Sequence, residues 1–187
     1  MGTLSFTATI SLDGFATDAD GDFRWSSPSA EVFDFHVERM AAVSTEVLGR
    51  RAYELMRYWE TEPPGEEWGP AEREFARRWC ALELVVASTT LTPAELSSER
   101  ARLVPRLDLA ELERLVAEAP GEVEIFGPTT AAEAIRAGLV RDFRLFVVPQ
   151  TLGGGLPALP PGAVLDLALV EQRVFANGTV LLHYAAR

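Results

Sequence analysis

The chain has 187 residues, with a hydrophobic fraction of 48% and a charged fraction of 24%, as is typical of a globular domain. Its formal net charge of −11 argues against a nucleic-acid partner, because phosphate backbones require a basic surface. All 17 basic residues are arginine, and Cys80 is the single cysteine, which excludes an intrachain disulfide and a thiolate metal cage. We interpret Cys80, between Trp79 and Leu82, as a small buried hydrophobic residue.

The N-terminus lacks the charged and apolar regions of a secretion signal, and no apolar run approaches the ~20 residues that cross a bilayer. These features predict a cytoplasmic protein without a membrane partner. The length predicts one domain over residues 1–187. His36 and His183 lie on apolar-patterned segments and lack the spacing of metal ligands, so we expect structural roles and no metal site.

Strand and helix patterns alternate along the chain. Strands are predicted over 4–12, 46–48, 84–87, around 103, over 123–126 and 143–148, and twice within 164–184, where the turn is Asn177-Gly178. Helices are predicted from the N-cap Ser29 to about 43 and over 50–59, 70–79, 109–119 after the cap Asp108, and 130–137. This order predicts an α/β fold: a mostly parallel sheet with helices on both faces and an antiparallel C-terminal edge.

Ligands of such sheets bind beyond the carboxyl ends of the strands, and three strand ends carry suitable residues. Gly49-Arg50-Arg51 offers close backbone approach, free amides and positive charge. Ser88-Thr89-Thr90 offers hydroxyls for a ribose or phosphate, and Gly127-Pro128-Thr129-Thr130 is a second helix start with hydroxyls. Each segment alone is also explained as a turn, a strand end or an N-cap. The three together favour a dinucleotide, which has several separated anionic and polar groups.

A glycine-rich segment at 153–158 matches the dinucleotide fingerprint G-x-G-x-x-G/A in letters only. That fingerprint must open a helix after the first strand of a βαβ unit. Pro157, Pro160 and Pro161 prevent a helix here. We therefore predict a flexible loop and reject a Rossmann fold.

Several motifs follow one another along the chain: Ser11-Leu12-Asp13-Gly14, Leu48 to Glu54, Ala87 to Leu91, Gly138 to Leu145, and Val148-Pro149 leading to Gly153-Gly154-Gly155. In this order they resemble the dihydrofolate-reductase-like family that includes the C-terminal reductase domain of the riboflavin-biosynthesis protein RibD. The resemblance covers nearly the whole chain. It implies a central sheet of eight strands, a homodimer, NADPH as cofactor, and hydride transfer from the nicotinamide to a C=N or C=O bond.

The resemblance also implies roles for single residues. Cofactor contacts would come from Gly49, Arg50 and Arg51 at the pyrophosphate, Gly127, Thr129, Thr130 and Ala131 at a second phosphate corner, Ser88 and Thr89 at the adenosine ribose, and Thr9 and Ala16 at the nicotinamide amide. Asp13, Trp25 and Gly153 are the candidate substrate contacts. Trp25 is suited to stacking on a heterocycle or to packing its own loop.

Two positions depart from the family pattern. Thr89 stands where an arginine is usual, so NADH is an alternative to NADPH unless Arg102 or Arg106 supplies the missing charge. Pro128 stands where the family has a second glycine, and the related peptide bond in dihydrofolate reductases is cis. Because a cis bond costs only about 0.5–1 kcal/mol before proline, we predict a cis Gly127-Pro128 bond.

The proton donor is a carboxylate on the first helix in folate reduction, and Asp34, with Glu31 one turn earlier, lies near that place. The alternative is that both are solvated carboxylates. The primary hypothesis is an NADPH-dependent reductase of a small pterin-, pyrimidine- or flavin-related compound, with ribosylaminouracil reduction as one option. The second hypothesis is a non-catalytic ligand-binding protein on the same fold.

Overall fold

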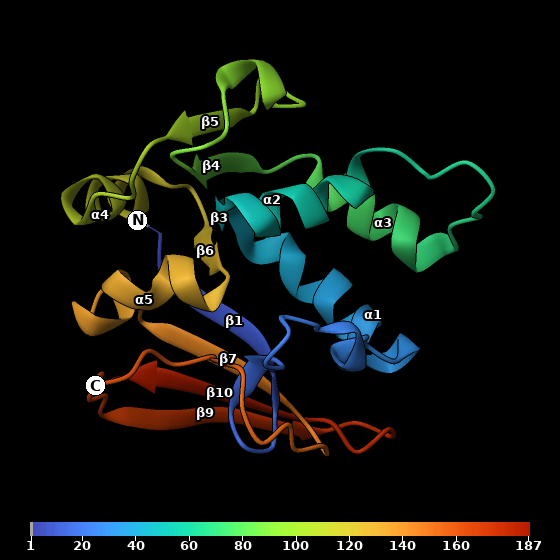
Figure 1. Ribbon diagram of the computed structural model, residues 1–187, viewed down its shortest axis with the longest axis vertical. Helices are drawn as coiled ribbons and strands as arrows, with labels where there is room; N and C mark the ends of the chain where they lie inside the picture. Colours follow the sequence, from blue (N-terminus) through green and yellow to red (C-terminus); the bar gives the residue numbers. More distant parts are fainter. Residues whose placement is uncertain (1) are drawn as a thin grey trace.

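The computed structural model describes residues 2–187, and its centre is a sheet of eight strands in the order β5-β4-β3-β6-β1-β7-β10-β9 (Figure 1). Neighbours from β5 to β7 pair in parallel, whereas β10 runs antiparallel to both β7 and β9. The strands are β1 (Leu4–Ser11), β3 (Val43–Gly49), β4 (Glu83–Ala87), β5 (Ala101–Val104), β6 (Glu122–Phe126), β7 (Asp142–Val148), β9 (Leu167–Val174) and β10 (Val180–Ala186). The predicted class, strand number and antiparallel edge are confirmed.

Helices cover both faces of this sheet, as predicted (Figure 1). One side carries α1 (Ala30–Arg39), α2 (Arg50–Met56) and α3 (Pro70–Trp79), and the other carries α4 (Leu109–Glu118) and α5 (Pro128–Arg136). Short 3-10 helices are η1 (Arg24–Ser26), η2 (Met40–Ala42), η3 (Arg57–Glu60) and η4 (Pro93–Glu95). The expected caps are present, since Ser29 accepts from the Val32 amide at 3.4 Å and Asp108 from the Glu111 amide at 3.1 Å.

The central strand β1 separates two different environments. Leu4, Phe6, Ala8 and Ile10 face the apolar core beneath α4 and α5, where Leu112, Ala131 and Ile135 are fully buried. The alternate residues, Ser5, Thr7, Thr9 and Ser11, face the side of α1. A second apolar cluster, built around Tyr53 and Trp79, packs α2 and α3 against β3 and β4.

A two-stranded ribbon lies outside the predicted elements. In it β2 (Phe15–Thr17) pairs antiparallel with β8 (Leu156–Pro157). Gly155 permits this pairing, because its φ of +133° is a glycine conformation and an added Cβ would collide with the Thr17 carbonyl. The glycine- and proline-rich segment therefore forms no helix, as predicted, but it is held against the β1–β2 connection.

Two sequence predictions are wrong. Residues 2–187 contain no cis peptide bond, so Gly127-Pro128 is trans; the chain turns into α5 through the positive φ of Gly127, +100°. Cys80 is exposed rather than buried, because it follows the last turn of α3, whose inward positions are taken by Phe75, Ala76 and Trp79. Within the described part of the chain, no helix has the length and apolar character needed to cross a bilayer.

Candidate functional site

A cavity of about 1230 Å³ lies beyond the carboxyl ends of β1, β3, β4 and β6. Drug-sized ligands occupy pockets of ~300–1,000 Å³, so this cavity has room for a larger ligand or for two ligands together. One end, which we call the phosphate end, is formed by the starts of α2 and α5. The other, the ring end, lies between β1, η1 and α2.

At the phosphate end, helix α5 begins without a side-chain cap. Gly127 is the N-cap residue and makes no side-chain hydrogen bond, and Pro128 has no amide hydrogen. The amides of Thr129 and Thr130 therefore have no partner within the helix, and the positive end of the helix dipole faces the cavity. Such a helix start favours an anionic group.

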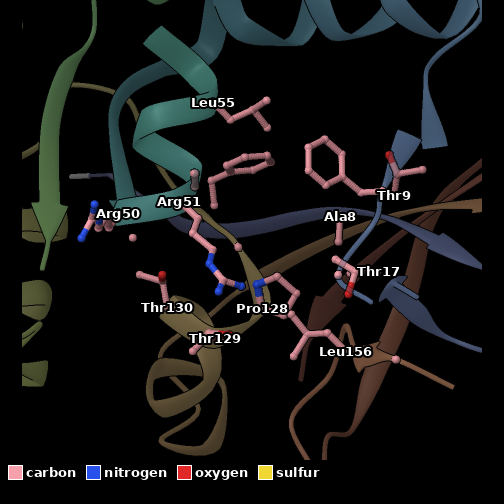
Figure 2. Close-up of a pocket in the computed structure, with 18 of the residues that line it drawn as sticks. Ala8, Thr9, Thr17, Arg50, Arg51, Leu55, Pro128, Thr129, Thr130 and Leu156 are labelled. Atoms are coloured by element: carbon pink, nitrogen blue, oxygen red, sulfur yellow. The ribbon is translucent and has the colours of Figure 1, made fainter. Parts of the chain in front are cut away.

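Arg51 adds a full positive charge at the same place. Its side chain extends from α2 toward Pro128 and Thr130, whereas the Arg50 side chain points away from α5 (Figure 2). Arg50 is held there by Glu54, at 2.8 Å, and by the Thr90 hydroxyl, at 2.9 Å. Of the two arginines, Arg51 is thus the one directed at a ligand beside α5.

The two helix starts meet at Gly49. A Cβ placed on Gly49 would lie 2.6 Å from the Thr130 hydroxyl oxygen, so a side chain at this position would collide with Thr130. Glycine thus lets the starts of α2 and α5 approach each other closely.

Arg106 lies at the outer rim of the phosphate end, near Ala87 and Leu107. It forms a long ion pair with Glu133, at 3.3 Å, and its side chain is 79% exposed. Arg102 does not line the cavity and is paired with Glu111 instead. Arg106 is therefore the one of these two arginines that a bound ligand can reach.

The ring end is mainly apolar. Its walls are Phe23, Leu55, Ala52 and Phe126, and its polar groups come from Thr7, Thr9 and Ser26. Thr7 and Phe126 are direct partners in the parallel register of β1 and β6, so their side chains share one sheet face. Flat apolar walls with few hydroxyls are typical of a site for a planar ring. The sequence analysis did not identify Phe23, Leu55 and Phe126 as site residues. Of the three, only Phe126 had a signal in the sequence, because it directly precedes the candidate residue Gly127.

Several of the predicted cofactor residues line this one cavity: Thr9, Ala16, Gly49, Arg50, Arg51, Gly127, Thr129 and Thr130. Ser88 lies outside it, where its hydroxyl accepts the amides of Thr90 and Leu91 and shapes the turn after β4. Thr89 is exposed in that turn, and Ala131 is fully buried in the core behind α5.

The predicted substrate and proton-donor residues lie elsewhere. Asp13 accepts the amides of Leu152 and Gly153 and so joins two loops; hydrogen bonds, led by that from Ser11, lower its pKa to about 2. Trp25 donates its indole N–H to the Asp22 carbonyl within its own loop.

On the first helix, Glu31 accepts the Ala176 amide and so holds the C-terminal hairpin, while Asp34 is exposed. Neither carboxylate lines the cavity. Their roles as proton donors stay a prediction.

Behind the ring end, the α1 side of the sheet holds a buried charge network. Glu124 of β6 is 1% exposed and accepts two hydrogen bonds from the Arg39 guanidinium, one of them at 2.9 Å. It also accepts the Thr7 hydroxyl at 3.1 Å. Burial, and then the charge of Arg39, lower the pKa of His36 to about 3, and its Nδ1 accepts from Arg39 Nε at 3.2 Å.

The second histidine is also bound within the fold, since His183 Nε2 lies 2.8 Å from Asp142. No group of three His, Cys, Asp or Glu side chains between residues 2 and 187 is arranged to hold a metal ion.

Comparison with known proteins finds relatives that match nearly the whole chain. The uncharacterized protein YyaP of Bacillus subtilis is 25% identical over 179 residues, which cover 94% of this chain and 90% of YyaP. A Shewanella sp. PV-4 protein that has been linked to riboflavin biosynthesis has a similar structure, with a TM-score of 0.77, 21% identity and 99% of each chain covered.

The fold is also that of dihydrofolate reductase. The Enterococcus faecalis enzyme, solved as a complex with NADP(H), matches with a TM-score of 0.61 and 14% identity over 99% of this chain and 96% of its own. At the level of sequence, the model of the RibD C-terminal domain matches residues 3–181. The chain therefore belongs to the RibD C-terminal domain family of dihydrofolate-reductase-like proteins.

Proposed function

We propose that this protein is a nicotinamide-dependent reductase that reduces a small heterocyclic or carbonyl compound related to a pterin, pyrimidine or flavin. The observation that carries the proposal is one continuous cavity. Arg51 and the uncapped start of α5 form one end of it, and an apolar site suited to a planar ring forms the other. Such a cavity suits a long anionic cofactor beside a small ring. Family membership, which covers residues 3–181, supports the same assignment.

The residues at the phosphate end fit a pyrophosphate. The amides of Thr129 and Thr130 and the Arg51 guanidinium supply donors of two kinds, and Gly49 lets the two helix starts that carry them lie close together. Thr9 and Ala16 lie farther along the cavity, where they would orient the nicotinamide. When bound, the nicotinamide supplies the hydride.

The ring end would hold the substrate. Phe23, Leu55 and Phe126 exclude water and offer surfaces for stacking, which fixes a ring relative to the nicotinamide. Reduction of a ribosylaminouracil, the reaction of RibD reductase domains, is one candidate among the pyrimidine substrates.

Titration with NADPH, followed by tryptophan fluorescence or calorimetry, tests the phosphate end. Arg51→Gln should weaken NADPH binding by about tenfold to a hundredfold, because a hydrogen bond to a charged group contributes about 1.5–3 kcal/mol. Arg57→Gln, outside the cavity on the following 3-10 helix, is the matched control and should bind as the wild type does. Absence of NADPH binding by the wild type at millimolar concentration would refute the proposal, as would equal weakening by both substitutions.

NADPH is the proposed cofactor, with NADH as the alternative raised by Thr89. Arg106 is placed to pair with a phosphate at the rim of the cavity, in the role that Thr89 cannot fill. Because Arg106 is 79% exposed, we expect Arg106→Gln to weaken NADPH binding by only about twofold to fivefold and to leave NADH binding unchanged. Arg102→Gln is the control. Equal effects of Arg106→Gln on both cofactors would contradict this role.

The second candidate function is a ligand-binding protein without catalysis. It is favoured by the position of Glu31 and Asp34 outside the cavity, because these are the carboxylates that the resemblance implies for protonating a substrate. The two functions differ in one measurement. A reductase consumes bound NADPH when ring compounds are added, whereas a binding protein holds NADPH without oxidising it.

We also propose that the protein is a homodimer that uses the outer strand β9. Leu169, Val170 and Val174 on this edge are 52%, 57% and 72% exposed, an apolar edge of a kind that proteins usually cover. Sedimentation should give a dimer for the wild type and a monomer for Val170→Arg. A monomeric wild type would refute this proposal.

A further inference from the structure

Thr7 is the most buried of the three hydroxyl residues at the ring end. Thr7 is 4% exposed, lines the cavity, and lies on β1 next to Phe126 of β6. A ligand ring that packs on Phe126 would therefore have one edge at the Thr7 oxygen. What that oxygen offers to a ligand depends on where its hydrogen points.

The hydrogen of Thr7 is directed away from the cavity. The hydroxyl donates to Glu124 at 3.1 Å, and this bond is buried. Glu124 is paired with Arg39 through both of its oxygens, so it is an ionised carboxylate that can only accept. Burial alone would lower the pKa of Arg39, but Glu124 reverses this and the pKa is raised, which keeps the guanidinium charged.

The remaining contacts leave Arg39 and Glu124 little freedom to rearrange. Arg39 Nε is bonded to His36, and its other two nitrogens are bonded to Glu124. Each partner is thus fixed by the next, from α1 to β6 to β1. Thr7 lines the cavity and its hydrogen is engaged by Glu124, so its oxygen can accept a hydrogen bond from a ligand there but has no hydrogen to donate.

We propose that Thr7, oriented by Glu124 and Arg39, selects a planar ring that presents an N–H group at this point, such as a lactam or imide N–H of a pyrimidine or pteridine. A ring carbonyl at the same place would meet lone pairs without a hydrogen and would be disfavoured. This inference rests on the proposed function only in taking the ring end as the binding site for the substrate. Thr7 is the specificity-determining residue, and Glu124 and Arg39 are positioning residues.

The test compares two probes in the absence of cofactor. Lumazine has imide and lactam N–H groups, and 1,3-dimethyllumazine has the same rings with both replaced by N–CH₃. Wild-type protein should bind lumazine more tightly than the dimethyl compound, as measured by calorimetry. In Thr7→Val, which keeps the shape of the side chain and removes its oxygen, this preference should fall by about tenfold, the effect of one hydrogen bond.

Two control variants separate ligand selection from folding. Thr7→Ser keeps the hydroxyl and should keep the preference. Ser5→Ala removes a hydroxyl that donates to Glu122 at 2.6 Å, on the same face of β1 but outside the cavity, and should also leave the preference unchanged. A substitution that only loosens the packing of this polar face would lower the affinity for both probes equally. It would therefore not change the ratio of the two affinities.

Glu124→Gln gives a second, independent test. Its side-chain amide can donate to the Thr7 oxygen and so release the hydroxyl hydrogen toward the cavity, which should reduce the preference for lumazine although Thr7 is intact. The inference is overturned if Thr7→Val keeps the wild-type ratio, if Glu124→Gln keeps it where the valine variant does not fold, or if the wild type has no preference. Failure of NADPH binding, by contrast, would refute the proposed reductase and leave this ratio unaffected.

Discussion

The two faces of β1 differ in chemistry although they share one strand. Toward α4 and α5 the strand contributes Leu4, Phe6 and Ile10 to an apolar core. Toward α1 it contributes Ser5, which donates to the half-buried Glu122 of β6, and Thr7, which donates to the buried Glu124. Burying apolar surface stabilises a fold, whereas burying paired charges gains little or costs stability. We infer that the apolar face holds the fold together and that the polar face is retained for the cavity it adjoins.

The largest effect should come from breaking one ion pair on the polar face. Arg39→Met leaves Glu124 charged and buried without its partner, which should lower the free energy of unfolding by about 3–5 kcal/mol. Urea denaturation measures this loss. The double variant Arg39→Met with Glu124→Met should recover much of it, since a buried ion pair can be replaced by apolar side chains at little cost. A loss below about 1 kcal/mol for Arg39→Met would show that the pair is not critical.

On the apolar face, a truncation should cost stability without altering ligand selection. Leu112 of α4 is fully buried in the core beneath α4 and α5, and Leu112→Ala should destabilise the protein by about 3 kcal/mol through the cavity that it leaves. Urea denaturation gives the stability, and calorimetry of the folded variant should give the wild-type ratio for the two lumazines. An altered ratio would mean that the apolar face also affects ligand selection, so that the two faces of β1 are not independent.

The contrast between the faces also explains which features the sequence could reveal. Helix 70–79 and the cap at Asp108 were predicted where the structure has them, because proline at N1 and an N-cap carboxylate are local signals. The antiparallel ending followed from the turn at Asn177-Gly178. In contrast, the ribbon of β2 and β8 depends on three residues pairing with two that are far away in the chain, which leaves no periodic signal.

The buried charges could not be predicted in the same way. Glu122 and Glu124 alternate with Val123 and Ile125, a pattern that normally indicates a face open to solvent. Arg39 covers Glu124 and Arg144 pairs with Glu122, and these arginines come from α1 and β7, far away in the chain. The phosphate end was predicted in part because glycine and arginine at a helix start carry their own signal, whereas Phe23 reaches the ring end through a loop whose path has none.

The effect most specific to the polar face is a pH dependence due to Glu46, which is small over any one pH unit. This residue of β3 is 2% exposed, neighbours Glu124 in the parallel register and accepts the Trp79 indole N–H at 2.6 Å. Burial first, and then the charge of Glu124, raise the pKa of Glu46 from 4.5 to about 8.

The folded protein thus keeps a proton on Glu46 that the unfolded chain releases near pH 4.5. The stability that this proton provides is complete below that pH and is lost as the pH rises through about 8.

Glu46→Gln isolates this contribution, because glutamine keeps an acceptor for Trp79 and does not titrate. Relative to the variant, the wild type should lose up to about 1.4 kcal/mol of unfolding free energy for each pH unit between about 5 and 8. Urea denaturation of both proteins across this range measures the difference, in which the contributions of all other titratable groups cancel. Parallel stability curves would mean that Glu46 is ionised in the folded protein as it is in the unfolded chain. The expected result is that the two curves separate as the pH rises. If they meet at low pH, the variant is the more stable protein at high pH, because there the wild type must bury the charge of Glu46.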